Sequence, residues 1–287
     1  MRTLFTLLAL LLAGSVAAQD TDDRRPPLFV MDGGDNRVYL LGSVHVLPDG
    51  ALPMPAHVED AYGEAEVLAF ELDLDLAQAG ASGMMAAAMD EVTIGEALTA
   101  EQSDSLDTAL AAVGLPAGAL DALEPWFAGL MYGVMALQQS GLPMQEGGVD
   151  AYFFHRAKAD GKPRRAFETM ALQTAAFDDL RTETQVEYLL ESIRSSPDSL
   201  ATEFAALVEA WGRGDDDRLA EMMNEGMSHP EVFEALLVTR NRAWVPQIES
   251  LLAGDETALV VVGAGHLVGE GSVVEMLRQA GYTVERL

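Results

Sequence analysis

Two histidines, His45 and His266, stand near opposite ends of the sequence in the same local pattern. Each closes a Gly-x-x-His step, over residues 42–45 and 263–266, and each step follows an apolar run typical of a strand. A strand that ends in glycine and then presents a polar side chain is a common way for α/β enzymes to place chemistry at a sheet edge. If both strands share one sheet, both imidazoles can point to one site.

A carboxylate, Glu71, lies within another apolar run, residues 65–74, which we interpret as a strand. Burying this charge is costly unless it is paired or bound to a cation. Two neutral imidazoles and a carboxylate form a ligand set for Zn²⁺, Mn²⁺, Co²⁺ or Fe²⁺ that leaves positions for water and substrate. Such an ion lowers the pKa of bound water and polarises a carbonyl, which suits hydrolysis. The alternative is a solvated strand face, because Asp73 and Asp75 continue the alternation outward.

Three further polar residues are candidates for catalysis. Glu168 follows a short strand candidate, residues 164–167, so it is placed like Glu71 and can act as a general base. It can equally cap the helix that follows. Arg240 and Asn241 lie where two predicted helices meet. Arg240 can hold a substrate carboxylate or a developing oxyanion, with Asn241 orienting it, whereas binding of helix C-terminal carbonyls is the alternative.

Other catalytic signatures do not occur in the sequence. It contains no His-Glu-x-x-His, no Gly-x-Ser-x-Gly and no P-loop. Residues 263–269 imitate a dinucleotide-binding loop, but too few residues follow them to complete a nucleotide-binding unit. We expect surface or packing roles for His57, His155 and His229, which lack the strand–glycine context.

The elements that must position the candidate residues are strands near both ends of the chain and helices between them. We predict strands over residues 28–31, 37–44, 65–74, 164–167, 258–262 and 282–287. We predict helices over residues 99–113, 124–139, 148–160 and 271–280, and several more over residues 171–253. The fold class is therefore mixed α/β (α+β) and helix-rich, with a central mixed β-sheet that the N- and C-terminal strands build and helices cover.

Composition and the N-terminus restrict the class of protein. Residues 1–18 have one positive charge, a short apolar core and small residues before Gln19, as in a secretory signal peptide. We therefore expect a periplasmic or secreted protein without a membrane span, with a flexible leader over residues 19–27 and one domain over residues 28–287. The net charge of −29 argues against nucleic acid as a partner. The absence of cysteine excludes disulfides and thiolate chemistry.

The motifs together resemble the TraB/GumN (PrgY) family, whose animal members are the Tiki proteases. The resemblance rests on residues 39–48 (YLLGSVHVLP), 70–73 (FELD), 148–152 (GVDAY), 161–163 (GKP), 167–169 (FET) with Gln173, 240–241 (RN), 262–271 (VGAGHLVGEG) and 281–282 (GY). The two Gly-x-x-His steps, the strand glutamate and the Arg-Asn pair are the hallmarks of the family. The resemblance implies a fold related to erythromycin-esterase-like and ChaN-like proteins. From the Tiki proteins it implies a metal-dependent peptidase that favours Mn²⁺ or Co²⁺, with Zn²⁺ also possible.

The hypothesis from the sequence is an exported metal-dependent hydrolase, expected to be a peptidase. The predicted metal ligands are His45, Glu71 and His266, and the predicted catalytic residues are Glu168, Arg240 and Asn241. Two alternatives stay open: a metal-independent hydrolase of the esterase or lactonase kind, and a non-catalytic protein that binds peptides or metal. The sequence leaves open whether the substrate is a peptide or another small molecule, which metal binds, and the oligomeric state.

Overall fold

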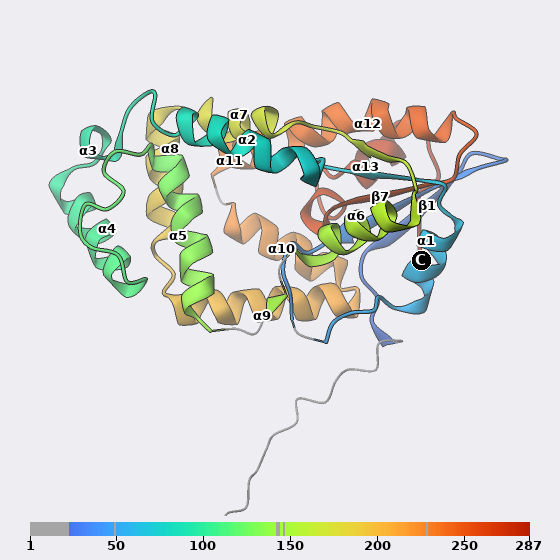
Figure 1. Cartoon of the computed structure of the whole chain (residues 1–287), viewed down its shortest axis with the longest axis horizontal. Helices are drawn as coiled ribbons and strands as arrows, with labels where there is room; N and C mark the ends of the chain where they lie inside the picture. Colours follow the sequence, from blue (N-terminus) through green and yellow to red (C-terminus); the bar gives the residue numbers. More distant parts are fainter. Residues whose placement is uncertain (1–22, 49, 142–143, 146, 228) are drawn as a thin grey trace, which may run out of the picture.

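A mixed six-stranded sheet forms the centre of the computed structural model, and helices cover both of its faces (Figure 1). The structure describes residues 23–287 except residues 49, 142–143, 146 and 228. The predicted signal peptide, residues 1–18, and residues 19–22 of the predicted leader lie outside this described part. Among the described helices, none has the length and apolar character needed to cross a membrane.

The sheet joins strands from both ends of the chain, as the sequence predicts. In spatial order its strands are β6 (Arg164–Ala166), β4 (Val67–Phe70), β7 (Ala258–Gly263), β2 (Arg37–Ser43), β1 (Leu28–Asp32) and β8 (Glu285–Arg286). The first four are parallel, whereas β1 is antiparallel to both β2 and β8. Because Gly42 of β2 pairs with Val262 of β7, the two Gly-x-x-His segments leave neighbouring strands at one edge. The predicted helix-rich fold with a central mixed sheet is confirmed.

Each face of the sheet has its own apolar core, because alternate strand residues point to opposite faces. The helices against the sheet are α1 (Ala56–Glu64), α6 (Gly148–Asp160), α9 (Pro197–Arg213), α10 (Asp216–Gly226), α12 (Thr239–Leu252) and α13 (Val273–Gln279). Leu259 and Val261 of β7 pack in the core shared with α1, α6, α9 and α10. Val260 and Val262 pack in the core shared with α12 and α13. Burial on both faces explains why β4 (VLAF) and the first five residues of β7 (ALVVV) are entirely apolar.

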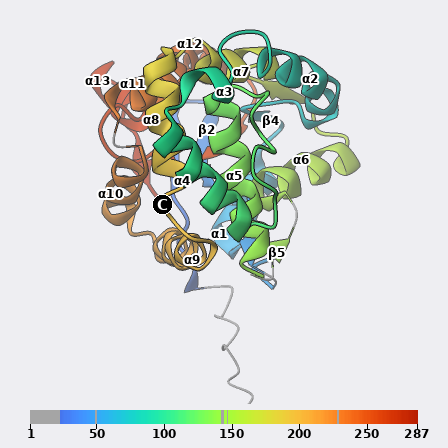
Figure 2. The same ribbon diagram turned by 90° about the vertical axis from the view of Figure 1, so that its left-hand side faces the viewer.

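A second group of helices lies beside the sheet and forms what we call the helical part (Figure 1). Its members are α2 (Leu74–Ala87), α3 (Ile94–Ala97), α4 (Ala100–Ala112), α5 (Pro125–Gln139), α7 (Met170–Asp178) and α8 (Thr182–Ser192). The chain enters α2 after β4 and α7 after β6, and these two helices pack against each other. Figure 2 views the molecule from this part, with α4 and α5 in front and the sheet behind. A small sheet also pairs β3 (Leu47–Pro48) with β5 (Met144–Gln145).

Local signals at helix ends predict several boundaries correctly. Thr99 caps α4 in a capping box with Gln102, in which each side chain binds the backbone of the other residue. Gly161 ends α6 in the left-handed conformation, at φ +72°. The helices predicted over residues that became α4, α5 and α6 are confirmed to within one residue at either end.

The predicted strand over residues 65–74 is wrong in its second half. β4 ends at Phe70, and the Asp73 carboxylate accepts a hydrogen bond from the Asp75 N–H at the N-cap of α2. Glu71 and Asp73 therefore do not share a strand face. The N-cap prevails over strand extension because it satisfies an N–H group of the first turn of α2 that would otherwise lack a partner.

One helical stretch over residues 230–252 replaces the predicted meeting of two helices at Arg240. It begins as α11 (Pro230–Phe233), widens into the π-helical turn η2 (Glu234–Val238) and continues as α12. Single π-helical turns inside helices occur frequently at functional sites. This one ends just before Arg240.

Residues 24–27, predicted to belong to a flexible leader, pack against the fold instead. The buried Arg24 guanidinium donates to the Pro53 carbonyl at 2.7 Å. The Arg25 N–H donates to the Gly212 carbonyl at 2.8 Å. These bonds fix the chain before it enters β1.

Candidate functional site

Four neighbouring parallel strands each deliver one candidate side chain at their carboxyl ends. His45 follows β2, His266 lies on the short helix η3 (Ala264–His266) after β7, Glu71 follows β4, and Glu168 follows β6. The carboxyl edge of parallel strands is where open α/β sheets bind ligands. The two Gly-x-x-His steps, far apart in sequence, thus meet at one edge of the sheet.

Gly263 lies at the centre of this arrangement. A Cβ atom on Gly263 would lie 3.3 Å from Glu71 Oε1, 3.6 Å from His266 Cδ2 and 3.7 Å from His45 Nε2. The Gly263 N–H also donates to Glu71 Oε1 at 2.7 Å. The three predicted ligands therefore surround one point, and any side chain at position 263 would intrude among them.

His266 is buried and neutral. Its Nδ1 lies 2.6 Å from the Oδ1 of Asn241, whose Nδ2 donates to the Gly271 carbonyl at 2.8 Å. This arrangement places the imidazole proton on Nδ1 and turns the Nε2 lone pair toward Arg240 NH1, 3.3 Å away. The Trp244 ring packs on the imidazole with the ring centroids 4.4 Å apart. Burial lowers the pKa of His266 to about 3.

His45 lies in a contrasting environment, with its side chain 69% exposed. Its Nδ1 lies 2.9 Å from Asp150 Oδ2, and Ser43 Oγ donates to Asp150 Oδ1 at 2.7 Å. The hydrogen bond to the Asp150 carboxylate raises the pKa of His45 to about 9. In the metal-free protein at neutral pH, His45 is therefore an imidazolium.

The first turn of α6 brings Asp150 to His45. The Val149 N–H donates to the Val44 carbonyl at 3.0 Å. A Cβ atom on Gly148 would lie 2.1 Å from that carbonyl oxygen, and Gly148 has φ +51°. Because a side chain at this position is excluded on both counts, glycine is what lets α6 approach the His45 loop.

Glu71 is held as a carboxylate by donors on both of its oxygens. Its Oε2 accepts from Arg240 NH2 at 2.7 Å and from Gln173 Nε2 at 3.2 Å. Burial alone would raise the pKa of Glu71, but the imidazoles of His266 and His45, the Arg240 guanidinium and the backbone lower it to about 2. At neutral pH, where His266 is uncharged, Arg240 and His45 supply the positive charge that keeps Glu71 ionised.

Arg240 joins the two strand-end glutamates. Its Nε lies 3.1 Å from both carboxylate oxygens of Glu168, and its NH2 donates to Glu168 Oε2 at 2.9 Å as well as to Glu71. Its NH1 donates to the Leu236 carbonyl at 3.0 Å and lies near His266 Nε2. These partners engage all five N–H groups of the guanidinium. Arg240 can therefore contact a substrate only by giving up one of these bonds.

Glu168 fixes the position of the Arg240 guanidinium. Besides Arg240, its Oε1 accepts from Trp244 Nε1 at 2.8 Å, and only 6% of its side chain is exposed. Both carboxylate oxygens of Glu168 already accept hydrogen bonds from Arg240 or Trp244, so neither is free to take a position beside a water molecule or substrate. These contacts favour a positioning role for Glu168 over the predicted role of general base.

All six residues predicted for the site belong to one connected cluster. They are His45, Glu71, Glu168, Arg240, Asn241 and His266. No role was predicted for Asp150, Ser43 or Trp244, although Asp150 stands in the segment of residues 148–152 that carries the family resemblance. The other histidines pack elsewhere: His155 lies against Phe154, and His229 caps α11.

The donor set at this edge fits a divalent transition metal in its chemistry. Both histidines have Nδ1 engaged by an acceptor, which is how proteins commonly orient histidine ligands, and Glu71 is ionised between them. Two features compete with an ion. The Arg240 guanidinium already contacts Glu71 and His266, and the three donors are not among the described groups whose ligand atoms all lie within 4.8 Å of one another. The metal-ligand roles of His45, Glu71 and His266 therefore stay a prediction.

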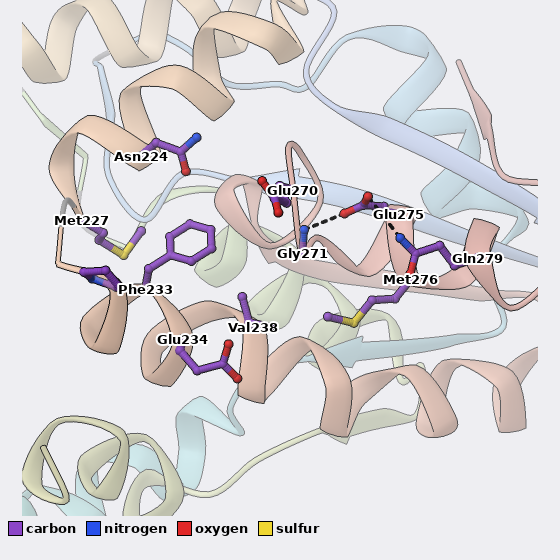
Figure 3. Close-up of a pocket in the computed structure, with 11 residues that line it drawn as sticks. Asn224, Met227, Phe233, Glu234, Val238, Glu270, Gly271, Glu275, Met276 and Gln279 are labelled. Atoms are coloured by element: carbon purple, nitrogen blue, oxygen red, sulfur yellow. Dashed lines mark hydrogen bonds between the residues drawn. The ribbon is translucent and has the colours of Figure 1, made fainter.

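A cavity of about 620 Å³ is lined by Glu270 and Gly271, between η3 and α13, and by residues of α10, α11, η2 and α13 (Figure 3). Its wall includes Gly271, whose carbonyl binds Asn241 and whose N–H donates to Glu275 at 2.6 Å. Phe233 and Val238 of the stretch before Arg240 also line it. The residues around Gly263 do not line this cavity, so it contacts the supports of His266 rather than the site itself.

Comparison with known proteins places these features in a family. A model of the TraB/PrgY/gumN family matches residues 27–286. The uncharacterized protein YbaP of Escherichia coli (strain K12) is 24% identical over 258 residues, which cover 88% of this chain and 92% of YbaP. A protein of Amphimedon queenslandica named metalloprotease TIKI homolog is 27% identical over 176 residues, 53% of this chain but only 34% of that protein. No solved structure matches the chain, so the likeness to erythromycin-esterase-like and ChaN-like folds stays a prediction.

Proposed function

This chain belongs to the TraB/PrgY/gumN family, as its motifs predict, and we propose that it is an exported metal-dependent hydrolase that cleaves peptide bonds. The observation that carries the proposal is the convergence of His45, Glu71 and His266 around Gly263. The similarity to a protein named as a metalloprotease homolog supports the same reaction class. Export rests on the signal-peptide features of residues 1–18 alone.

In this proposal His45, Glu71 and His266 hold the ion. When bound, the ion lowers the pKa of a water molecule and polarises the scissile carbonyl. Asp150 holds His45 with its Nε2 near Gly263, and Asn241 fixes the His266 ring, whose Nε2 lies 3.9 Å from Glu71 Oε1. Mn²⁺ or Co²⁺ are the ions we expect.

The remaining residues prepare the edge of the sheet for that chemistry. Glu168 and Trp244 fix Arg240, and Arg240 with Gln173 fixes the Glu71 carboxylate. Because Arg240, Gln173 and the Gly263 N–H all donate to it, the buried Glu71 carboxylate keeps one orientation, and little reorganisation is needed when charge develops on a substrate.

A second candidate function is hydrolysis without metal. It is favoured by Arg240, a permanent cation that already contacts both Glu71 and His266 Nε2. It is also favoured by the hydrogen bond between Asp150 and His45, which keeps the exposed imidazole ready to give or take a proton. In this reading His45 is the general acid and base.

The first experiment measures the metal content of the purified protein by elemental mass spectrometry, after dialysis and reloading with Mn²⁺, Co²⁺ or Zn²⁺. The test variant is His45→Ala with His266→Ala, and the matched control is His155→Ala, an exposed histidine outside the site. The same samples are incubated with a peptide library, with and without chelator, and products are read by mass spectrometry. Circular dichroism checks that each variant is folded.

The outcomes separate the candidates. About one ion per chain that the double variant loses, with peptide cleavage that chelator stops, supports the metal-dependent peptidase. Cleavage that resists chelator and needs His45 supports the metal-free hydrolase. Stoichiometric peptide binding without product would contradict both and indicate a binding protein.

A further inference from the structure

Three carboxylates gather in the helical part, outside the site at the sheet edge. They belong to Asp90, in the turn after α2, Glu124, at the N-cap of α5, and Asp178, the last residue of α7. One oxygen of each lies within 4.8 Å of an oxygen of the other two. Asp90 is exposed, Asp178 is half-buried and Glu124 is buried. An acidic group of this kind on a surface would need no explanation, but its innermost member is not at the surface.

Glu124 is the observation that points to a ligand. It is 1% exposed, and its Oε1 accepts from the Glu91 N–H at 3.0 Å, but its Oε2 is buried without a hydrogen-bond partner. A buried carboxylate oxygen without a partner is costly in free energy. The Asp178 carboxylate cannot satisfy Glu124 Oε2, because an ionised carboxylate only accepts hydrogen bonds. Its own Oδ1 accepts from Trp126 Nε1 at 3.2 Å. The group lacks a positive partner among its described contacts.

We propose that Asp90, Glu124 and Asp178 bind a calcium ion. All three side chains offer hard oxygen donors, and Ca²⁺ accepts irregular sets of carboxylate oxygens completed by water. The exposed side at Asp90 leaves room for that water. Mg²⁺ is the weaker choice because it requires a nearly ideal octahedron, and the softer ions expected at the histidine site prefer nitrogen ligands.

The pKa values of two members of the group agree with a cation site. Burial raises the pKa of Glu124, and the negative charges of Asp178, Glu91 and Asp90 raise it further. Burial and the charge of Asp90 also raise the pKa of Asp178. The ionised forms of Glu124 and Asp178 are thus destabilised by burial and by neighbouring negative charge, which a shared divalent ion would reverse.

The ion would fasten the far ends of the two helices that start at the site. α2 begins three residues after Glu71, and α7 begins two residues after Glu168. The two helices run together in Figure 1, and Gly80 of α2 faces Met170 of α7 so closely that a Cβ atom would lie 2.6 Å from Met170 Cβ. The calcium ion therefore ties α2, α5 and α7 together at the end opposite the sheet edge, and its role is to stabilise the helical part.

Terbium luminescence tests the site, because Tb³⁺ replaces Ca²⁺ and is sensitised by a nearby tryptophan. Trp126 contacts Asp178, so Tb³⁺ bound here is excited through Trp126. The measurement uses the full purified chain with His45→Ala and His266→Ala, so that the histidine site does not contribute. The test variants are Glu124→Gln and Asp90→Asn, and the matched control is Glu91→Gln, which removes a neighbouring exposed carboxylate.

We expect Tb³⁺ luminescence that excess Ca²⁺ abolishes, with a Kd for Ca²⁺ of about 10⁻⁴ to 10⁻³ M. Both test variants should lose at least about tenfold in affinity, and Glu91→Gln should keep it. In the background protein, 10 mM Ca²⁺ should raise Tm by about 3 to 8 °C. Trp126→Phe should lose the luminescence and keep the Ca²⁺-dependent rise in Tm.

Equal luminescence in the background protein and in Asp90→Asn would overturn the proposal, and so would a Tm that Ca²⁺ leaves unchanged. Asp90→Asn is decisive if Glu124→Gln fails to fold, because Asp90 is exposed. A Glu124→Gln protein that is more stable than the background, together with no response to Ca²⁺, would also overturn it and show that Glu124 is a buried protonated acid. None of these results depends on hydrolase activity.

Discussion

The loops that carry His45 and His266 have the same Gly-x-x-His pattern and leave adjacent parallel strands, yet they hold their histidines in opposite protonation states. His45 is exposed and bound to the Asp150 carboxylate, which raises its pKa to about 9. His266 is buried and bound to the neutral Asn241 amide, and burial lowers its pKa to about 3. The motif thus places two imidazoles at one edge, and the surroundings of each ring decide whether it is a charged imidazolium or a neutral imidazole.

The difference in protonation suggests different roles for His45 and His266. His266 keeps its Nε2 lone pair unprotonated and turned toward Arg240 NH1 at every physiological pH, as a ligand or acceptor should. His45 faces solvent and exchanges a proton in the mildly alkaline range, which suits the acid–base role of the second candidate function. In the metal-dependent proposal His45 must lose this proton to bind the ion. Asp150 on α6 raises the pKa of His45, whereas burial beside Asn241 and Trp244 of α12 lowers the pKa of His266.

Arg240→Met is expected to have the largest effect on stability and to change the surroundings of His266. Without the guanidinium, Glu71 and Glu168 become buried carboxylates without their main partner. We expect the free energy of unfolding to fall by about 3 to 5 kcal/mol, measured by urea denaturation. The pKa of His266 should rise, because the charge of Arg240 lowers it and that of Glu71 raises it.

Arg242→Met is the matched control for this prediction. Arg242 lies on the same helix, but it is 63% exposed and pairs with Glu234. We expect a change within about 0.5 kcal/mol. Equal losses in the two variants would contradict a special role for Arg240.

A smaller change should exchange the properties of the two histidines. In Asp150→Asn, the pKa of His45 should fall from about 9 toward its ordinary value of about 6.5. In Asn241→Asp, a carboxylate beside Nδ1 should raise the pKa of His266 above about 3. Imidazole ¹⁵N NMR titration of the metal-free proteins measures both values.

The pH dependence of stability follows from the same shifts, with opposite signs. The raised pKa of His45 stabilises the fold fully below about pH 6.5, and this contribution is lost as the pH rises through about 9. Asp150→Asn should therefore destabilise most at low pH. The lowered pKa of His266 favours the fold above about pH 6.5, and this contribution is lost as the pH falls toward about 3. An Asp150→Asn variant whose largest loss of stability occurs above pH 9 would contradict this account.

The sequence predicted what local patterns determine and missed what distant helices determine. The apolar runs before Gly42 and Gly263 were sufficient to predict that both strands share one sheet, because buried parallel strands have few other places to pack. The end of β4 was predicted wrongly because Leu72 and Leu74 continue the strand alternation, while the Asp73 cap begins a helix. The capping signal and the strand signal overlap there, and only packing resolves them.

The partners of the histidines were out of reach for a different reason. Asp150 lies 105 residues from His45, and Asn241 lies 25 residues from His266. Whether an imidazole meets a carboxylate or an amide depends on how α6 and α12 dock on the sheet, and no spacing in the sequence encodes that docking. The motif therefore predicted the location of the site but not the protonation states within it.

The smallest effect is expected from Ser43, which contacts His45 through Asp150. Ser43 Oγ donates to Asp150 Oδ1, so it holds the carboxylate in the orientation that binds His45 Nδ1. In Ser43→Ala we expect a loss of about 1 kcal/mol in the free energy of unfolding and a several-fold loss of any hydrolysis that requires His45. Ser192→Ala is the control, because its hydroxyl donates to the Tyr188 carbonyl within α8, away from the site. If both variants lose stability alike and Ser43→Ala keeps full hydrolysis, the Asp150 orientation is not limiting, and the contrast between the two histidines then rests on charge and burial alone.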